Sequence, residues 1–201
     1  MVQEYTHRAE QYDSQWSFYI EATTRETLAR LPLRPTDSLL DIGCGNGALL
    51  EPLARTFPHA KLAGMDPVAN MLALARRKLP SRASLCGGWA EQLPYKDASF
   101  DVVVSCNMFH YVREPRTALE EMMRVLRPGG WIVITDWCDD YLACRICAGF
   151  VRLFSSALFK VYRGQECLNL FKSFGGEAAV ERYKISWLWG LMTVRFHKQP
   201  K

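Results

Sequence analysis

The chain of 201 residues lacks several features that would each point to a particular class of protein. No stretch of about 20 residues is free of charged side chains, which argues against a membrane-spanning helix. The first residues, MVQEYTHRAEQYD, contain no apolar core typical of a secretory signal peptide. Internal repeats, Ser/Gly linkers and low-complexity tracts are also missing, so we expect a single globular domain over 1–201.

A dense basic stripe and a metal-binding cysteine pattern are missing too. The net charge is only +4, so we expect no nucleic-acid partner. Cys144 and Cys147 form a CxxC, but no second CxxC or HxxxH follows, and we predict no metal site. Seven cysteines is an odd number, which favours a reducing, cytoplasmic location. With 49% hydrophobic and 23% charged residues, the composition excludes extensive disorder.

Short apolar runs alternate with segments of helical spacing along most of the chain. Strands are predicted over residues 38–42, 61–66, 82–86, 100–106 and 131–136. Helices are predicted over 47–57, 67–78 and 114–126, the last closed by a turn at 127–130. This alternation indicates a doubly wound α/β sheet. Further along, helices are predicted over 140–160 and 164–174, and an antiparallel strand pair over 179–187 and 191–197.

The sharpest local signal is the run Asp41-Ile42-Gly43-Cys44-Gly45-Asn46-Gly47 between a strand and a helix. Glycines allow the backbone to turn tightly and to approach a ligand closely. The spacing is G-x-G-x-G, whereas the dinucleotide fingerprint is G-x-G-x-x-G. No Gly-Lys-Ser/Thr follows, which excludes a P-loop. A tight turn that binds nothing stays as the alternative.

An acid closes the second predicted strand. Asp66 lies 23 residues after Gly43, because 66 − 43 = 23. A carboxylate at that place can accept both ribose hydroxyls of a nucleoside. A ligand without phosphates needs no third glycine turn, so the two signals together favour a nucleoside that carries no pyrophosphate.

Four segments appear in a particular order: DIGCGNG, GMDPVANML, AEQLPYKDASFDVVVS and LRPGGWIVITD. Together they resemble the class I S-adenosylmethionine-dependent methyltransferases, in particular the branch with the ubiquinone and menaquinone methylases. The resemblance is close over 38–137. It implies a Rossmann-like, seven-stranded, mostly parallel sheet whose last strand is antiparallel and lies between the fifth and sixth strands. It also implies S-adenosyl-L-methionine as cofactor and S-adenosyl-L-homocysteine as product.

The resemblance implies roles for individual residues. Gly43 and Gly45 would pack against the methionine part of the cofactor, and Asp41 would orient the loop or meet its amino group. Asp66 would hold the ribose, and Pro67 and Met71 would lie near the adenine.

The family commonly shows Gly-Asp-Ala after the third strand, but this chain has Gly88-Trp89-Ala90. Trp89 could cover the adenine beside Ala90, or Glu91 could reach it; a merely surface-covering Trp89 is the alternative. Asn107 follows the fourth strand, where the family places residues that line the cofactor and the transfer path.

Three residues are candidates for the acceptor side. Residues 9–13 resemble the A-x-x-Y-D entry helix of the quinone methylases, whose tyrosine lies near the sulfonium; here that is Tyr12. His110 is a candidate general base, because histidine is the side chain that most often transfers protons near neutral pH, although packing at the pocket edge is equally consistent. Asp136, at the carboxyl end of the fifth strand, is a further candidate base.

The predicted organisation is that of one methyltransferase domain. It divides into N-terminal cover helices at 1–36, a cofactor-binding core at 37–136, a substrate cover helix at 137–162, and a C-terminal helix with antiparallel strands at 163–201. We expect methyl transfer by in-line displacement to a small, lipophilic or aromatic acceptor. An NAD-dependent oxidoreductase and a non-catalytic cofactor-binding module stay open. So do a monomer or homodimer, and contact of 140–163 with a membrane surface.

Overall fold

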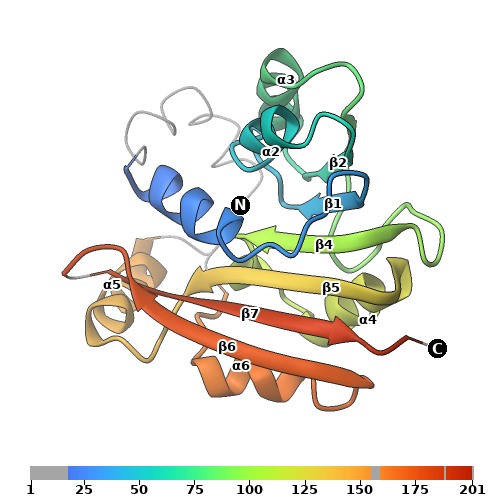
Figure 1. The fold of residues 1–201 in the computed structure, drawn as a ribbon. Helices are drawn as coiled ribbons and strands as arrows, with labels where there is room; N and C mark the ends of the chain where they lie inside the picture. Colours follow the sequence, from blue (N-terminus) through green and yellow to red (C-terminus); the bar gives the residue numbers. More distant parts are fainter. Residues whose placement is uncertain (1–17, 155–158, 188, 201) are drawn as a thin grey trace.

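The computed structural model describes residues 18–154, 159–187 and 189–200. Its seven strands form one sheet in the order β3-β2-β1-β4-β5-β7-β6 (Figure 1). The strands are β1 (Ser38–Ile42), β2 (Lys61–Met65), β3 (Ser84–Cys86), β4 (Phe100–Cys106), β5 (Leu126–Trp137), β6 (Gly176–Lys184) and β7 (Gly190–Lys198). Strands β1 to β5 pair in parallel, and β7 runs antiparallel between β5 and β6. The predicted fold class is confirmed.

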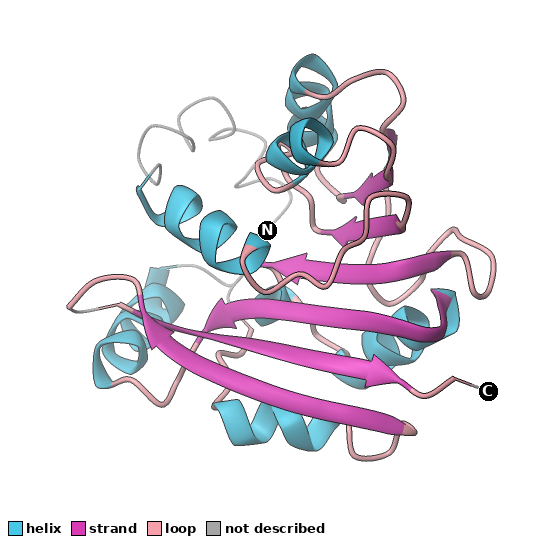
Figure 2. Cartoon of the chain, in the orientation of Figure 1, coloured by secondary structure: helices cyan, strands magenta, loops and turns pink. Residues whose placement is uncertain are grey.

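Helices cover both faces of this sheet (Figure 2). A first helix spans residues 18–28. The others are α2 (Leu50–Thr56), α3 (Ala69–Lys78), the 3-10 turn η1 (Phe109–Tyr111), α4 (Pro115–Val125), α5 (Leu142–Phe154) and α6 (Gly164–Leu170).

Alternating apolar residues in the strands create the two cores. Leu39 and Val102 pack with α2 and α3 on one face. Leu40 and Val103 pack with α4 and α6 on the other. Because successive side chains of a strand point to opposite faces, continuous apolar runs are what a sheet covered on both sides requires.

The boundary between α4 and β5 differs from the expected one. The sequence predicts a turn at 127–130, but β5 begins at Leu126 and continues through those residues. Phe100 pairs with Leu126 and Val102 with Trp131, so the segment between them bulges out of the ladder. Gly129 has φ +75°, a conformation that glycine adopts without strain. The turn residues therefore form a bulge inside a longer strand.

The helix predicted over 140–160 corresponds to α5, which is described from Leu142 to Phe154; residues 155–158 lie outside the described part of the chain. Within residues 18–154, 159–187 and 189–200, no helix combines the length and the apolar character needed to cross a bilayer. The carboxyl ends of β1, β2, β4 and β5 point to the same side of the molecule, and α5 lies at that side (Figure 1).

Candidate active site

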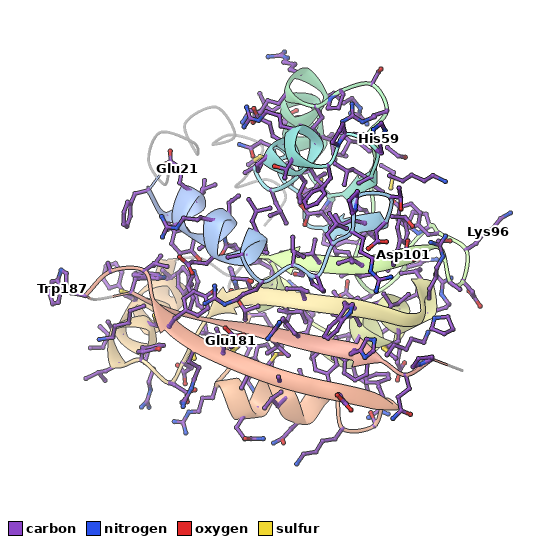
Figure 3. The ribbon with its side chains drawn as sticks, viewed as in Figure 1. Glu21, His59, Lys96, Asp101, Glu181 and Trp187 are labelled. Atoms are coloured by element: carbon purple, nitrogen blue, oxygen red, sulfur yellow. The ribbon has the colours of Figure 1, made fainter. Side chains whose placement is uncertain are left out.

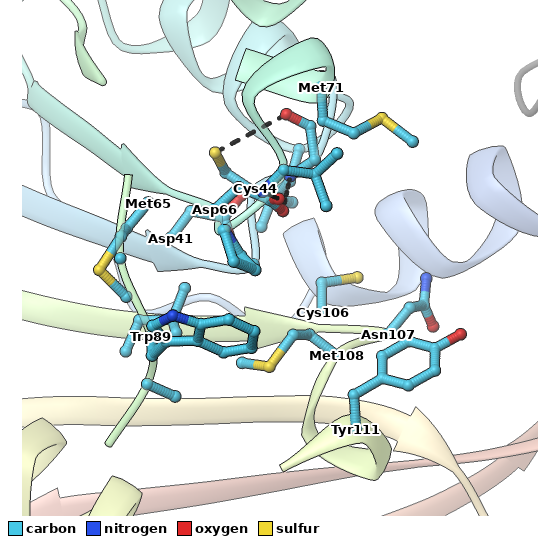
Figure 4. Close-up of a pocket in the computed structure, with 18 of the residues that line it drawn as sticks. Asp41, Cys44, Met65, Asp66, Met71, Trp89, Cys106, Asn107, Met108 and Tyr111 are labelled. Carbon is cyan, nitrogen blue, oxygen red and sulfur yellow. Dashed lines mark hydrogen bonds between the residues drawn. The ribbon is translucent and has the colours of Figure 1, made fainter. Parts of the chain in front are cut away.

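A cavity of about 450 Å³ opens at the carboxyl ends of β1, β2 and β4 (Figure 4). Open α/β sheets bind ligands at this position, where the strand order reverses. The nine residues predicted to bind the cofactor all line it: Asp41, Gly43, Gly45, Asp66, Pro67, Met71, Trp89, Ala90 and Asn107. Sequence positions spread over 67 residues are thus brought to one surface.

The glycine loop after β1 is held by the neighbouring strand. The backbone N–H groups of Gly43 and Cys44 both donate to the carbonyl of Met65, at 2.7 and 3.0 Å. Gly43 and Gly45 have φ values of +74° and +52°, in the left-handed region that disfavours a side chain. A Cβ on Gly43 would overlap the Met108 side chain, whereas one on Gly45 would meet no heavy atom within 4 Å. Gly45 therefore leaves open space where a ligand can approach the backbone.

Asp66 fixes this loop with its carboxylate. Oδ2 accepts a hydrogen bond from Gly45 N at 2.9 Å, and Oδ1 accepts one from Val68 N at 2.8 Å. Burial raises the pKa of Asp66, and the two backbone donors oppose that rise. A carboxylate offers about four lone-pair sites, so the group retains capacity for hydroxyl donors of a ligand.

Asp41 is a buried acid on the wall of the cavity. Its Oδ1 atom has no hydrogen-bond partner within the described part of the chain. Burial, with a smaller contribution from the nearby charge of Asp66, raises its pKa to about 8. An unpaired carboxylate oxygen in a ligand cavity fits a cationic or hydrogen-bond-donating group of the ligand.

Trp89 lies at the rim of the cavity. Its side chain is 53% exposed, and it stands near Met108 in Figure 4. Glu91 also lines the cavity. Trp89 as a cover for the adenine and Glu91 as its carboxylate contact are therefore both compatible with the geometry.

Asn107 follows β4, and its side chain is hydrogen-bonded to helix 18–28. It has φ +57°, and its Oδ1 accepts a hydrogen bond from the Tyr19 hydroxyl at 2.7 Å. Its Nδ2 donates to Thr23 Oγ1 at 2.7 Å, and the indole of Trp137 donates to the Tyr19 hydroxyl. Ile20 of the same helix lines the cavity. Helix 18–28 is thus bonded to the carboxyl ends of β4 and β5 and forms one wall of the site.

Two of the three acceptor-side candidates lie in direct contact. His110 and Asp136 are buried, and His110 Nδ1 lies 2.6 Å from Asp136 Oδ1. Asp136 Oδ2 also accepts from the His110 backbone N–H at 2.9 Å. Neither side chain is among those lining the cavity, although Tyr111, whose ring centroid is 4.0 Å from that of His110, is. Tyr12 lies outside the described residues.

Sequence reasoning missed part of the lining. The additional side chains come mainly from the first helix and from the segment after β4: Ile20, Thr24, Cys106, Met108, Tyr111, Val112 and Arg113. Thr23 and Thr27 do not line the cavity themselves, but their four-residue spacing places two hydroxyls on the same side of helix 18–28, facing the end of β4. Thr27 Oγ1 lies 3.3 Å from Cys106 Sγ at the end of β4.

Comparison with known proteins agrees with this arrangement. A family model described as a methyltransferase domain matches residues 40–134. A demethylmenaquinone methyltransferase of Symbiobacterium thermophilum is 36% identical over 143 residues, covering 64% of this chain and 55% of that protein. The chain spans about half the length of this and other curated relatives that it matches.

Two solved structures have the same fold along the whole chain. One belongs to a complex between the Haloferax volcanii Trm112 methyltransferase activator and a methyltransferase; it has a TM-score of 0.86 at 22% identity and covers 100% of this chain and 98% of that one. The other is a SAM-dependent methyltransferase of Thermotoga maritima, with a TM-score of 0.80 at 21% identity, covering 99% and 100%. The chain is therefore similar in sequence to methyltransferases over residues 40–134, and it shares its fold with these two solved structures along its whole length.

Proposed function

We propose that the chain transfers a methyl group from S-adenosyl-L-methionine to a small, lipophilic or aromatic acceptor by in-line displacement. The observation that carries the proposal is the cavity at the carboxyl ends of β1, β2 and β4, with the glycine loop and two acids on its wall. The bound sulfonium would supply an electrophilic methyl group. The protein then mainly has to orient the acceptor, and orientation alone can contribute up to ~7–11 kcal/mol.

The residues of the cavity fit such a cofactor. Asp66 would accept the ribose hydroxyls, and the loop at Gly43 and Gly45 would leave room for the methionine part. Asp41 would receive the amino group, because its Oδ1 is buried and without a partner in the described part of the chain. The rest of the site would enclose the adenine and the transfer path, with Pro67, Met71, Trp89, Ala90 and Asn107 on its wall.

The His110–Asp136 pair is proposed to hold one end of the acceptor site. If Asp136 accepts the Nδ1 proton, Nε2 of His110 is the nitrogen left to take a proton from an acceptor. The His110 carbonyl also accepts hydrogen bonds from the backbone of Phe159 and Lys160. Since both side chains are buried behind the cavity wall, these contacts favour positioning over direct proton transfer. Proton transfer by His110 or Asp136 stays a prediction, and so does the place of Tyr12 near the sulfonium.

We also propose the type of acceptor, the cellular compartment and the oligomeric state. A hydrocarbon-rich acceptor is supported by the apolar sequence of α5, which lies at the side of the sheet where the strands end but does not line the cavity itself. Seven free thiols are consistent with a reducing compartment such as the cytoplasm, and a monomer or homodimer is expected.

Binding to the purified chain tests the cofactor assignment. We expect calorimetry to detect S-adenosylmethionine and S-adenosylhomocysteine but not NAD(H), and mass spectrometry to find co-purified S-adenosylhomocysteine. Asp66→Asn should weaken binding at least tenfold, because it exchanges an acceptor facing the ribose for a donor. Asp97→Asn, on an exposed acid outside the cavity, is the matched control.

Two outcomes would redirect the proposal. Binding of NAD(H) in place of S-adenosylmethionine would restore the oxidoreductase alternative. Tight cofactor binding without turnover of any member of a broad acceptor panel would favour the non-catalytic module. Unchanged affinity in Asp66→Asn would remove the ribose assignment alone.

A further inference from the structure

Helix α5 uses only one of its faces to pack on the sheet. Ala148 and Val151 belong to a cluster with Trp137 of β5 and Leu191 of β7. Cys144, one turn before Ala148, is buried, and its thiol donates to the Gly190 carbonyl at 3.2 Å. The spacing of 144, 148 and 151 defines a continuous inner face.

The outer face of the same helix is also apolar. Leu142, Ile146 and Phe150 follow each other at four-residue spacing and are 69%, 64% and 62% exposed. Phe159, just after this region, is 51% exposed. A soluble surface helix ordinarily turns polar residues to this side, so an outward apolar row marks an interaction surface.

The tip of the β6–β7 hairpin adds an aromatic side chain to this surface. Trp187 is 85% exposed and projects away from the body of the molecule (Figure 3). The hairpin and α5 lie side by side, because Ile185 and Trp189 pack on the cluster that contains Ala148 and Val151. We call the set Leu142, Ile146, Phe150, Phe159 and Trp187 the apolar end.

Basic side chains outnumber acidic ones around the apolar end. Residues 139–166 and 182–184 contain six basic and three acidic side chains, and Lys160 pairs with Glu166 at 3.6 Å. Arg145 and Arg163 are about half exposed, and the acid nearest to both, Asp139, lies 3.9 and 3.6 Å from them. Lys184 is exposed, and its Nζ donates to the Trp187 carbonyl at the hairpin tip.

We propose that the apolar end docks on the surface of a bilayer that contains anionic phospholipid. Protruding aliphatic and aromatic side chains can enter the interface between headgroups and acyl chains while neighbouring cations meet lipid phosphates. The excess of basic side chains favours this partner over a second copy of the chain, whose identical surface would bring like charges together. The inference goes beyond the proposed function and does not depend on it.

Vesicle binding tests this docking directly. The full chain is mixed with vesicles of pure phosphatidylcholine, or with vesicles that contain about one-third phosphatidylglycerol, and sedimented. We expect at least tenfold tighter binding to the anionic vesicles, and a marked loss at high salt because screening weakens the attraction. Brominated lipids should quench tryptophan fluorescence, and Trp187→Phe should lower that quenching.

Two matched pairs of variants locate the contact. Ile146→Ser with Phe150→Ser should weaken vesicle binding at least tenfold while near-ultraviolet and far-ultraviolet circular dichroism stay unchanged. Arg145→Gln with Lys184→Gln should weaken it several-fold, mainly on anionic vesicles. Arg76→Gln with Arg77→Gln removes the same charge from the exposed side of α3 and should have little effect.

Three results would overturn the proposal. The first is failure of the wild-type chain to sediment with anionic vesicles. The second is equal binding by the Ile146→Ser, Phe150→Ser variant. The third is a concentration-dependent dimer in light scattering that this variant abolishes, since the apolar end would then be an interface between copies. None of these results bears on cofactor binding.

Discussion

The glycine loop shows how single atoms set the shape of the site. Gly43 and Gly45 have similar positive φ values, yet their surroundings differ. A side chain on Gly43 would overlap Met108, whereas one on Gly45 would enter open space in the cavity wall. The same substitution should therefore reduce folding stability more at Gly43 than at Gly45, whereas at Gly45 it should act mainly on ligand binding.

We expect Gly43→Ala to lower the free energy of unfolding by about 2–4 kcal/mol, from left-handed backbone strain and overpacking. Gly45→Ala should lower it by only about 1–2 kcal/mol, yet still weaken cofactor binding through its methyl group. Urea unfolding and calorimetry measure the two effects.

Gly149→Ala is the control, because Gly149 lies in α5 with no atom near the position of its Cβ. This change should raise the free energy of unfolding by roughly 0.5–1 kcal/mol and leave binding unchanged. Equal losses at Gly43 and Gly45 would contradict the described loop.

At the level of elements, the sequence predicts most of what positions the site. Every predicted strand is present within a few residues, since apolar runs and glycine-ended turns are local signals. The bulge in β5 could not be predicted, because it depends on pairing between Phe100 and Leu126, a long-range contact. N-terminal cover helices are predicted, but the residues through which helix 18–28 meets the site are not, for the same reason: Tyr19 and Asn107 are 88 residues apart.

The contacts of helix 18–28 predict a local effect of Tyr19→Phe. The change removes the hydroxyl that donates to Asn107 and accepts from Trp137, leaving both groups without that partner. We expect a loss of about 1–3 kcal/mol, faster amide exchange within residues 18–28, and a few-fold weaker cofactor binding. Hydrogen exchange followed by mass spectrometry makes the measurement.

Tyr95→Phe is the matched control for this change. Its hydroxyl lies 3.1 Å from Cys86 Sγ at the end of β3, and it does not contact the first helix. We expect this variant to leave exchange in residues 18–28 unchanged. Equal exchange rates for wild type and Tyr19→Phe would show that the hydroxyl does not hold the helix in place.

For the whole molecule, the buried acid Asp41 connects stability to pH. Its folded-state pKa of about 8 lies above the ordinary value of 3.8, so the folded chain binds more protons than the unfolded chain between those pH values. The free energy of unfolding contributed by this group therefore falls as pH rises from about 4 to 8. Asp41→Asn should flatten that dependence in the free protein, as measured by urea unfolding at several pH values.

The same acid predicts a proton balance for ligand binding. If the carboxylate of Asp41 receives the amino group of the cofactor, binding must remove its proton, and roughly 0.9 proton should be released per molecule at pH 7 for a pKa near 8. Calorimetry in two buffers of different ionisation enthalpy counts these protons. Asp41→Asn should bind more weakly and release close to none. A wild-type chain that binds without releasing protons would mean that Asp41 stays protonated and orients the loop, so the cation would have to be held by another group.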